Sequence, residues 1–311
     1  YKRQMYFSFN TTILPHISFM NRCSTPEHWK HPRRTTNEYI LFIILSGEMY
    51  LQEDEKRYVL RRGDYIFLHP MHTHFGYKYS QCEYCYIHFP SDCLSGWDCA
   101  EIPQIMQIIL DNKKLVYQCD PFGDELYTKY KLFVPKDRHI YFHSTLQQIT
   151  ACIDEALLSE KRQMSHYKLI CSSLFIQIMI LLSRDFVANL FPEYLQGGSS
   201  ENSDKVYSLI HYLHNHYAEP ISGDWLSEYF DINFDSLNRL FKQETGVPIF
   251  HYLKQVRLNH ARELLTTTQL KMSEISEQTG FCDQYYFSRV FKQEFGISPK
   301  KYSISGTLDS K

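Results

Sequence analysis

The chain has 311 residues, of which 43% are apolar and 22% are charged, and its formal net charge is −2. This balance is close to the average of soluble globular proteins, so it excludes disordered and fibrous chains. A length of this order predicts two domains, because a typical domain has about 150 residues. The nine cysteines are irregularly spaced, and we interpret them as reduced thiols of a cytoplasmic protein.

The first part of the chain has the pattern of β structure. Short runs rich in Tyr, Ile, Val and Phe alternate with turn residues, and they cover residues 39–50, 56–60, 64–68 and 83–89. Several strands at such close spacing predict a sandwich or a small barrel. In the last run Tyr84, Tyr86 and His88 are two residues apart, so we expect their side chains to share one face.

The hydrophobic period changes after residue 144. Apolar residues then recur with helical spacing, at Leu146, Ile149, Ile153 and Leu157. A second long helix is predicted over residues 165–190, and it is apolar on more than one face. Two interpretations stay open for this helix, which are the core of the domain and the interface of a homodimer.

No segment predicts a membrane association. The most apolar stretch, Leu169–Leu182, is short and contains Ser and Gln, whereas a spanning helix needs about 20 apolar residues. Residues 1–10 lack the apolar core of a secretory signal. We therefore expect a cytoplasmic protein.

A change of composition predicts the domain boundary. Residues 196–204 read QGGSSENSD, which is typical of a flexible linker without an apolar anchor. We expect one domain over residues 1–195, this linker over 196–204, and a helical domain over 205–311.

The helical domain contains an internal repeat. The sequence RLFKQETG at 239–246 recurs as RVFKQEFG at 289–296. Each copy follows a capping residue, Asn233 or Asp283, and ends at a glycine that can terminate a helix. A short helix precedes each copy after a turn of about three residues, so each copy predicts a helix-turn-helix unit.

The outer faces of the two repeated helices carry side chains suited to a DNA major groove. Arg can donate two hydrogen bonds to guanine, Asn and Gln can pair with adenine, and Lys can reach a phosphate. Two copies with Arg and Lys in matching places are hard to explain as ordinary solvated faces. Residues 201–311 nevertheless carry 12 Lys and Arg against 14 Asp and Glu, so the prediction rests on local arrangement and not on net charge.

The segment between the repeats reads as one long helix over residues 249–266, with an apolar side. Such a helix would hold the two units at a fixed separation. Two recognition helices can enter successive major grooves when they lie about 34 Å apart, which is one turn of B-DNA.

The helical domain resembles the DNA-binding domain of AraC-type transcription regulators. The matching stretches are Leu240-Phe241-Lys242, Gly280-Phe281, Tyr286-Phe287-Ser288-Arg289, Phe291-Lys292, Gly296, Pro299 and Tyr302. The resemblance implies DNA contacts from Asp235, Asn238, Arg239 and Lys242 in the first unit and from Gln284, Tyr285, Ser288, Arg289 and Lys292 in the second. Asp235 could accept from cytosine or pair with Arg239, and we favour the pairing. Ser227 and Ser276 replace the usual Ala, and each hydroxyl is expected to bond back to its own helix.

The first domain resembles the cupin-like effector domain of the same family, through residues 63–74 and the strand ending in His88-Phe89. The predicted fold class is therefore α+β, with a cupin-like barrel and dimerisation helices followed by an all-α domain. The resemblance implies a small-molecule sensor, and family members that regulate carbohydrate use favour a sugar. Aromatic rings and hydroxyl-binding donors for such an effector would be Trp29, Arg33, Arg34, Tyr84, Tyr86 and His88.

The expected function is a homodimeric regulator that binds double-stranded promoter DNA, with no catalytic residues, metal ligands or cofactor. The alternative is a metal-dependent cupin enzyme with an appended helical domain. Against it, His72-x-His74 is not followed by the Glu that cupin enzymes place four or five residues later in the same strand, and a metal site needs three converging ligands. A further alternative is a constitutive regulator whose barrel serves only for dimerisation.

Overall fold

The computed structural model describes residues 5–10, 12–97, 102–123, 125–190 and 201–306. The chain divides into two compact units, one of residues 1–112 and 125–195 and the other of residues 113–124 and 196–311. Of the predicted linker, residues 196–200 lie outside the described residues, whereas residues 201–204 form the first turn of helix α6 (Glu201–Asn215). The domain boundary at residue 195 stays a prediction.

The first unit is built around one long strand, β4 (Tyr39–Glu53). Its first half pairs antiparallel with β6 and β8, and its second half pairs with β5 and β7. The change of partners follows a bulge between Ile44 and Ser46, which bends the strand so that it serves both sides of the barrel. The other strands of this sheet are β2 (Phe19–Ser24), β3 (Arg34–Thr35), β5 (Lys56–Arg61), β6 (Asp64–Leu68), β7 (Thr73–Gly76), β8 (Cys82–Phe89) and β11 (Asp137–His139).

Both faces of β4 are buried, which explains its nearly continuous apolar sequence. Leu41 and Ile43 point into a core that the sheet shares with the helices of this unit. Ile40, Phe42 and Ile44 point to the other side, into the core of the barrel. The alternation predicted for β8 is also present, since Tyr84 and Tyr86 lie on the barrel side.

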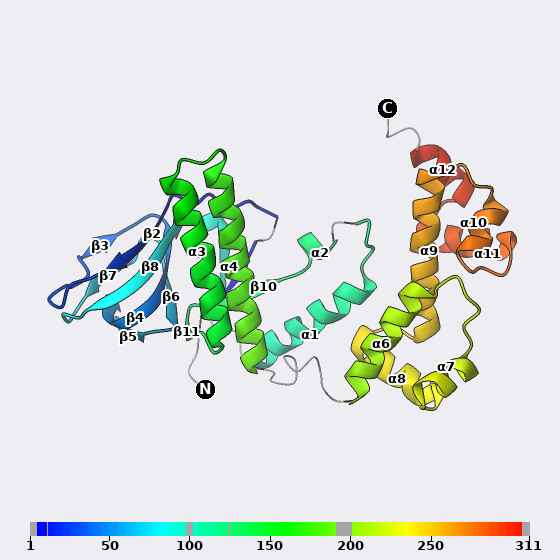
Figure 1. Cartoon of the computed structure of the whole chain (residues 1–311), viewed down its shortest axis with the longest axis horizontal. Helices are drawn as coiled ribbons and strands as arrows, with labels where there is room; N and C mark the ends of the chain where they lie inside the picture. The colour runs from blue at the N-terminus through cyan, green and yellow to red at the C-terminus, as the bar shows by residue number, and fades with distance from the viewer. Residues whose placement is uncertain (1–4, 11, 98–101, 124, 191–200, 307–311) are drawn as a thin grey trace. The chain divides into compact units, whose positions relative to one another are not determined.

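Two antiparallel helices, α3 (His143–Lys161) and α4 (Tyr167–Leu190), lie side by side against the sheet (Figure 1). The buried carboxylate of Asp185 accepts from the main-chain N–H groups of Tyr141 and Phe142 at 2.8 and 2.9 Å, so α4 caps the start of α3. Helix α4 is long and apolar enough to cross a membrane by length and composition alone, because it extends beyond the stretch 169–182. Half of its most apolar window is buried inside this unit, as in the core helix of a globular domain.

A second, three-stranded sheet completes the first unit. Its strand order is β10-β1-β9, and all pairs are antiparallel. Its elements and those that join them are β1 (Tyr6–Phe9), η1 (Ser91–Cys93), β9 (Leu94–Trp97), α1 (Ile102–Gln118), α2 (Glu125–Thr128) and β10 (Leu132–Pro135). Helix α1 begins in the first unit and ends in the second.

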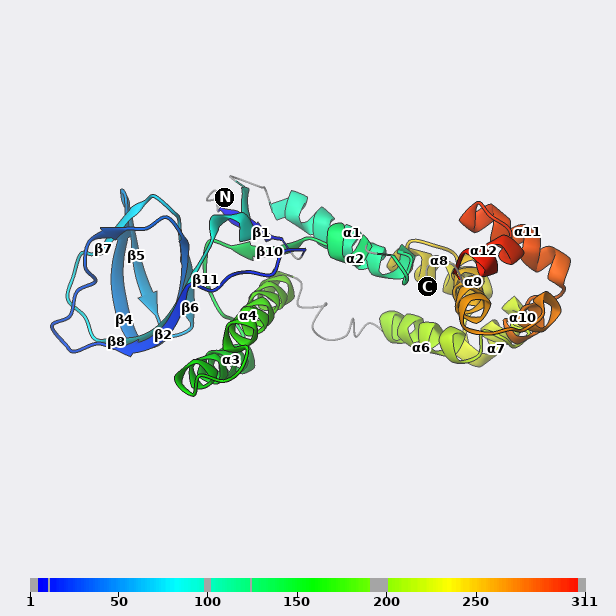
Figure 2. The same cartoon turned by 90° about the horizontal axis from the view of Figure 1, so that it is seen from above.

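The second unit is helical. Around the long helix α9 (Ile249–Thr267) lie α6, α7 (Gly223–Phe230) and α8 (Phe234–Thr245) toward one end and α10 (Met272–Gln278), α11 (Gln284–Phe295) and α12 (Pro299–Gly306) toward the other, as Figure 1 shows. In Figure 2 the same helices are seen from above, with α9 end-on. Each group has its own buried apolar core. The structure thus confirms the predicted fold class, with a sheet-rich first part and a helical second part.

Candidate functional site

The first helix-turn-helix unit consists of α7 and α8. Ser222 caps α7 by accepting from the Trp225 N–H, and Asn233 caps α8 by accepting from the Asp235 N–H. Between the helices Asp231 adopts a left-handed conformation with a φ of 49°, which Asp tolerates better than most residues. Helix α8 ends at Gly246 with a φ of 82°, as the sequence predicted.

The second helix-turn-helix unit repeats this plan with α10 and α11. Asp283 caps α11 by accepting from the N–H groups of Tyr285 and Tyr286, and these bonds lower the pKa of the Asp283 carboxyl. Gly280 forms the turn and Gly296 ends the helix, both with positive φ. The internal repeat therefore encodes the same local structure twice, with the inner faces of both helices buried in their cores.

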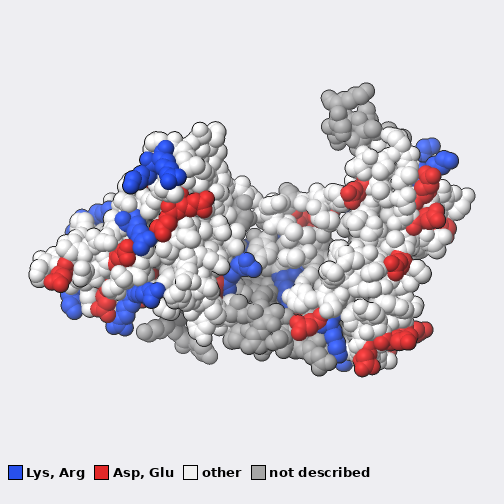
Figure 3. Space-filling view, viewed as in Figure 1, with Lys and Arg blue, Asp and Glu red and all other residues white. Residues whose placement is uncertain are grey.

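The outer faces of α8 and α11 present most of the predicted DNA-binding residues to solvent. In α8 the side chains of Asp235, Arg239 and Lys242 are exposed, and in α11 those of Tyr285, Arg289 and Lys292 are exposed. Gln284 and Ser288 are partly exposed. On the face of the second unit seen in Figure 3, acidic and basic side chains are interspersed, consistent with the composition of residues 201–311.

Three details concern the ion pairs and side-chain hydrogen bonds of α7 and α8. No ion pair joins Asp235 to Arg239, although the structure describes both side chains, so the favoured pairing is wrong. The side-chain oxygen of Asn238 accepts from the Ile249 N–H at 2.9 Å, which satisfies the first amide of α9. The hydroxyl of Ser227 bonds back to the Gly223 carbonyl at 3.0 Å, as expected.

The buried hydroxyl of Ser276, in contrast, has no hydrogen-bond partner within the described part of the chain. The back-bonding that we expected for Ser276 is therefore wrong.

In the sheet-rich first part of the chain, five of the six predicted effector residues lie together at the barrel. The rings of Trp29 and Tyr84 lie 5.8 Å apart, those of Tyr84 and Tyr86 5.9 Å, and those of Tyr86 and His88 5.8 Å. Arg34 lies on strand β3, and its Nη2 is 3.3 Å from His31 Nε2, whose ring centroid is 5.6 Å from that of Trp29. This row of rings with a guanidinium beside it has the composition of a site for a polar, ring-shaped ligand.

Arg34 is held between two histidines that the effector prediction did not include. Its Nε donates to His74 Nε2 at 3.2 Å, and its Nη2 lies 3.3 Å from His31 Nε2. Because a guanidinium only donates, both imidazole nitrogens must be acceptors, so both rings are neutral. The Nδ1 of His31 is then the protonated nitrogen, and it donates to the Pro32 carbonyl at 2.8 Å.

Burial and the Arg34 charge keep these imidazoles neutral. Burial is the larger cause, and together the two effects lower the pKa of His31 to about 3 and that of His74 to about 4. The pKa of His88 is also lowered, by burial and Arg34, although Glu38 at 3.6 Å opposes the shift. The two neutral imidazoles therefore serve as acceptors that hold the Arg34 guanidinium in place, so that the cluster presents one fixed cation.

Arg33, the sixth predicted effector residue, is not part of this cluster. Its side chain is exposed, and its guanidinium lies over the Phe75 ring at 4.5 Å from the ring centroid. Arg33 directly precedes strand β3, which begins at Arg34.

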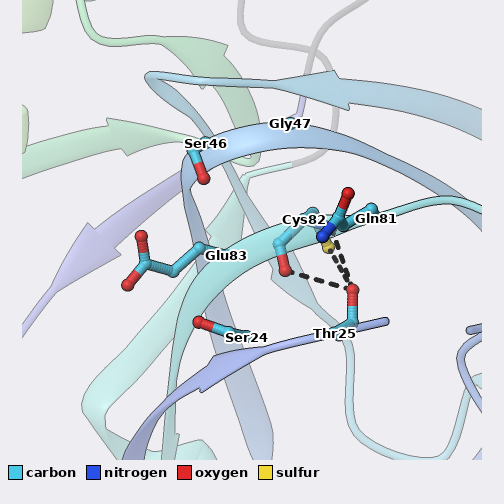
Figure 4. Close-up of a pocket in the computed structure, with 7 residues that line it drawn as sticks. All are labelled: Ser24, Thr25, Ser46, Gly47, Gln81, Cys82 and Glu83. Atoms are coloured by element: carbon cyan, nitrogen blue, oxygen red, sulfur yellow. Dashed lines mark hydrogen bonds between the residues drawn. The ribbon is translucent and has the colours of Figure 1, made fainter. Parts of the chain in front are cut away.

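A separate small groove of about 340 Å³ lies where β2, β4 and β8 meet (Figure 4). Thr25 and Cys82 bond to each other across it, since the Cys82 N–H donates to the Thr25 hydroxyl at 2.9 Å and that hydroxyl lies 3.1 Å from the Cys82 carbonyl. Glu83 is paired with Arg22 at 2.8 Å. Because these polar groups are engaged with one another, the groove is a weaker ligand site than the cluster around Arg34.

Among the residues that the structure describes, no three His, Cys, Asp or Glu side chains are grouped so that they could hold a metal ion. The described cysteines carry free thiols, and Cys99 lies outside the described residues.

Comparison with known proteins identifies both parts of the chain. A family model of the AraC-like ligand binding domain matches residues 24–178, and a model of the helix-turn-helix domain matches residues 226–303. Since the two models together match most of the chain and both of its units, the chain belongs to the family of AraC-type transcription regulators.

Individual relatives are more distant. The HTH-type transcriptional activator RhaS of Enterobacter sp. (strain 638) is 30% identical over 171 residues, which are 53% of this chain and 59% of the relative. The uncharacterized HTH-type transcriptional regulator YisR of Bacillus subtilis (strain 168) is 27% identical over 279 residues, or 88% of each chain. The chain thus spans less than two thirds of the RhaS relative.

A solved structure, the C-terminal domain of the response regulator AraT from Geobacillus stearothermophilus, is 32% identical and covers 32% of this chain and 84% of its own, with a TM-score of 0.32.

Proposed function

We propose that the chain is a sequence-specific, DNA-binding transcription regulator of the cytoplasm, controlled by a small-molecule effector. Helices α8 and α11 enter successive major grooves of promoter DNA. The observation that carries this proposal is the duplicated recognition helix, since Arg239 and Lys242 recur fifty residues later as Arg289 and Lys292, all four exposed. Arginines at both places can read guanine, while the lysines one turn further can neutralise phosphates.

The effector binds at the cluster of Trp29, Arg34, Tyr84, Tyr86 and His88 and is a sugar. The aromatic rings can cover the apolar face of a pyranose, while the Arg34 guanidinium and the His88 imidazole can bond its hydroxyls. The relative named as the activator RhaS supports a regulator and not an enzyme. An effector changes DNA binding only if it binds two arrangements of the protein unequally.

The protein acts as a homodimer through α3 and α4. These helices leave the large apolar side chains of Leu158, Leu169 and Ile180 exposed, and the loop between them exposes Met164. Such side chains on neighbouring helices are typical of a contact with a second copy. Sedimentation equilibrium of the wild type and of Leu169→Lys tests this part, because the charged variant should dissociate at concentrations at which the wild type is dimeric.

DNA binding is tested with fragments selected by the full chain from a random pool, followed by fluorescence anisotropy over a range of salt concentrations. We expect enrichment of two short segments about one helical turn apart and a falling affinity with salt. No enrichment at low salt would refute the proposal. A thermal-shift screen of sugars tests the effector class, because a ligand of the native state raises its apparent stability, and the Arg34→Met variant should lose the shift.

A further inference from the structure

The two helix-turn-helix units do not share a hydrophobic core. Helix α9 contributes Ile249, Leu253 and Val256 to the core of the first helix-turn-helix unit. It contributes Leu258, Ala261 and Leu265 to the core of the second. Because no buried apolar residue belongs to both cores, side-chain packing in the cores does not by itself set the angle between the two units. Helix α9 joins the two helix-turn-helix units, and a contact beside it can fix their relative orientation.

A short segment at the end of α6, residues 217–219, crosses the seam between the units. Arg257 of α9 donates from Nε to the Tyr217 carbonyl at 2.7 Å and from Nη2 to the Glu219 carbonyl at 2.8 Å. The Tyr217 ring stacks on His260 with 3.9 Å between ring centroids and 8° between planes. Burial lowers the pKa of the half-buried Arg257 guanidinium, as expected for a cation whose partners are neutral carbonyl groups.

The other side of this segment contacts the turn between α10 and α11 of the second helix-turn-helix unit. Gly280 has a φ of +75°, and a Cβ placed there would lie 2.8 Å from the Tyr217 carbonyl oxygen and 2.9 Å from the Ala218 Cα. Only a residue without a side chain allows the two main chains to approach so closely. Tyr217 itself packs against the core of the first helix-turn-helix unit. The segment therefore connects that core to the turn between α10 and α11.

The seam beside this contact is open. A groove of about 870 Å³ runs along it, lined on one side by Ala218, Pro220 and Ser222 and on the other by Ser276, Glu277 and Asp283. The two units are therefore joined by α9 and by the segment 217–219, and not by continuous packing. A polar latch of this kind fixes orientation through directional hydrogen bonds.

We propose that residues 217–219, held by Arg257 and approached by Gly280, form a latch that fixes the angle between the two recognition helices. The latch thereby determines how many base pairs the protein accepts between its two DNA segments. This inference rests on the proposed binding of two major grooves. Inserting one base pair turns the second segment by about 34° around the DNA axis, so a rigid pair of units loses one of its contacts while a loose pair can follow.

The test uses the full chain and DNA selected by the wild type, in the selected spacing and with one base pair inserted or removed. Arg257→Lys keeps the charge but cannot make the planar two-carbonyl contact. Loosening the link lowers the effective concentration of the second unit, so we expect affinity for the selected spacing to fall about tenfold. The penalty for the altered spacings should shrink in the variant, and binding to a fragment with one segment should stay the same.

Arg262→Lys is the matched control on the same helix. Its guanidinium donates to the Tyr302 hydroxyl at 3.1 Å and to the Asp120 carboxylate at 2.6 Å. Neither partner belongs to the segment 217–219, so this variant should keep the wild-type spacing penalty. Tyr217→Leu, which removes the stack on His260 but keeps an apolar side chain, is the second latch variant and should behave like Arg257→Lys.

The outcomes separate the two ideas. If the wild type binds all spacings equally, two-groove binding itself is refuted. If the wild type discriminates and both latch variants discriminate as strongly, the latch is refuted while the proposed function stands. A loss of binding to the single-segment fragment would also overturn the latch, because it would mean that the substitutions damage one unit and not the link between units.

Discussion

Acid should destabilise the sheet-rich first part of the chain through two buried imidazoles. His31 is 3% exposed and His74 is 1% exposed, and their pKa values are about 3 and about 4. In the unfolded chain a histidine titrates near 6.5. Below that pH the unfolded state therefore binds protons that the folded state refuses, and stability falls as the pH decreases from about 6.5 toward about 4.

The magnitude follows from the distance of the working pH from 6.5. At pH 5.5 the unfolded imidazoles are mostly protonated and the folded ones are not, so each one lowers the free energy of unfolding by about 1.4 kcal/mol. For His31 and His74 together the expected loss between pH 7.5 and pH 5.5 is about 3 kcal/mol.

Urea unfolding of the full chain at both pH values measures this loss. A Trp225→Phe background removes the tryptophan of the helical part, so the remaining tryptophan fluorescence reports the sheet-rich part. Other groups also titrate in acid, and the informative quantity is the difference between wild type and His31→Gln/His74→Gln. The double variant should lose about 3 kcal/mol less than the wild type on acidification, whereas His28→Gln, at an exposed position, should match the wild type. Equal losses in wild type and double variant would refute the reasoning.

Three further predictions concern single side chains. Arg239→Ala and Arg289→Ala should each weaken binding to selected DNA by about 1–3 kcal/mol, as measured by anisotropy, and an unchanged affinity for either would remove that residue from the interface. Asn238→Ala should lower the melting temperature of the helical part, because the first amide of α9 loses an acceptor worth about 1 kcal/mol. An unchanged melting temperature would contradict this role. Asp185→Ala removes the acceptor of two part-buried N–H groups, and each lost hydrogen bond should cost about 0.5–1.5 kcal/mol. Asp185→Asn keeps one acceptor and should lose less in denaturant titrations; similar losses would argue against the cap.

The strands and helices with strong local patterns were predictable from the sequence. The run 64–68 matches β6, and the capping residues Asn233 and Asp283 start α8 and α11 as expected. The sequence analysis made no prediction for the three-stranded sheet, whose strands have four residues each. Runs this short carry too little periodicity, and their pairing depends on segments far apart in the chain.

The candidate effector site was only partly predictable for the same reason. The row of Tyr84, Tyr86 and His88 follows from strand alternation alone. The place of His74 beside Arg34 depends instead on the pairing of β7 with β3, in which these two residues are directly opposite. Nothing local in the sequence specifies that register, so the sequence does not predict His74 as a partner of Arg34.

The structural role of Asn238 likewise depends on a distant segment, because its side-chain oxygen accepts from an N–H eleven residues later. Its contact with DNA stays a prediction.

The bulge in β4 has a consequence for how freely this surface can vary. Gly47 is exposed to solvent, with a φ of +71°, and a Cβ there would lie 2.2 Å from the Gln81 carbonyl oxygen. Ranking positions by solvent exposure would class residue 47 as freely mutable. The main-chain geometry makes it one of the least replaceable positions of the barrel, and a library selected for folded protein should retain glycine there while its neighbour Ser46 drifts.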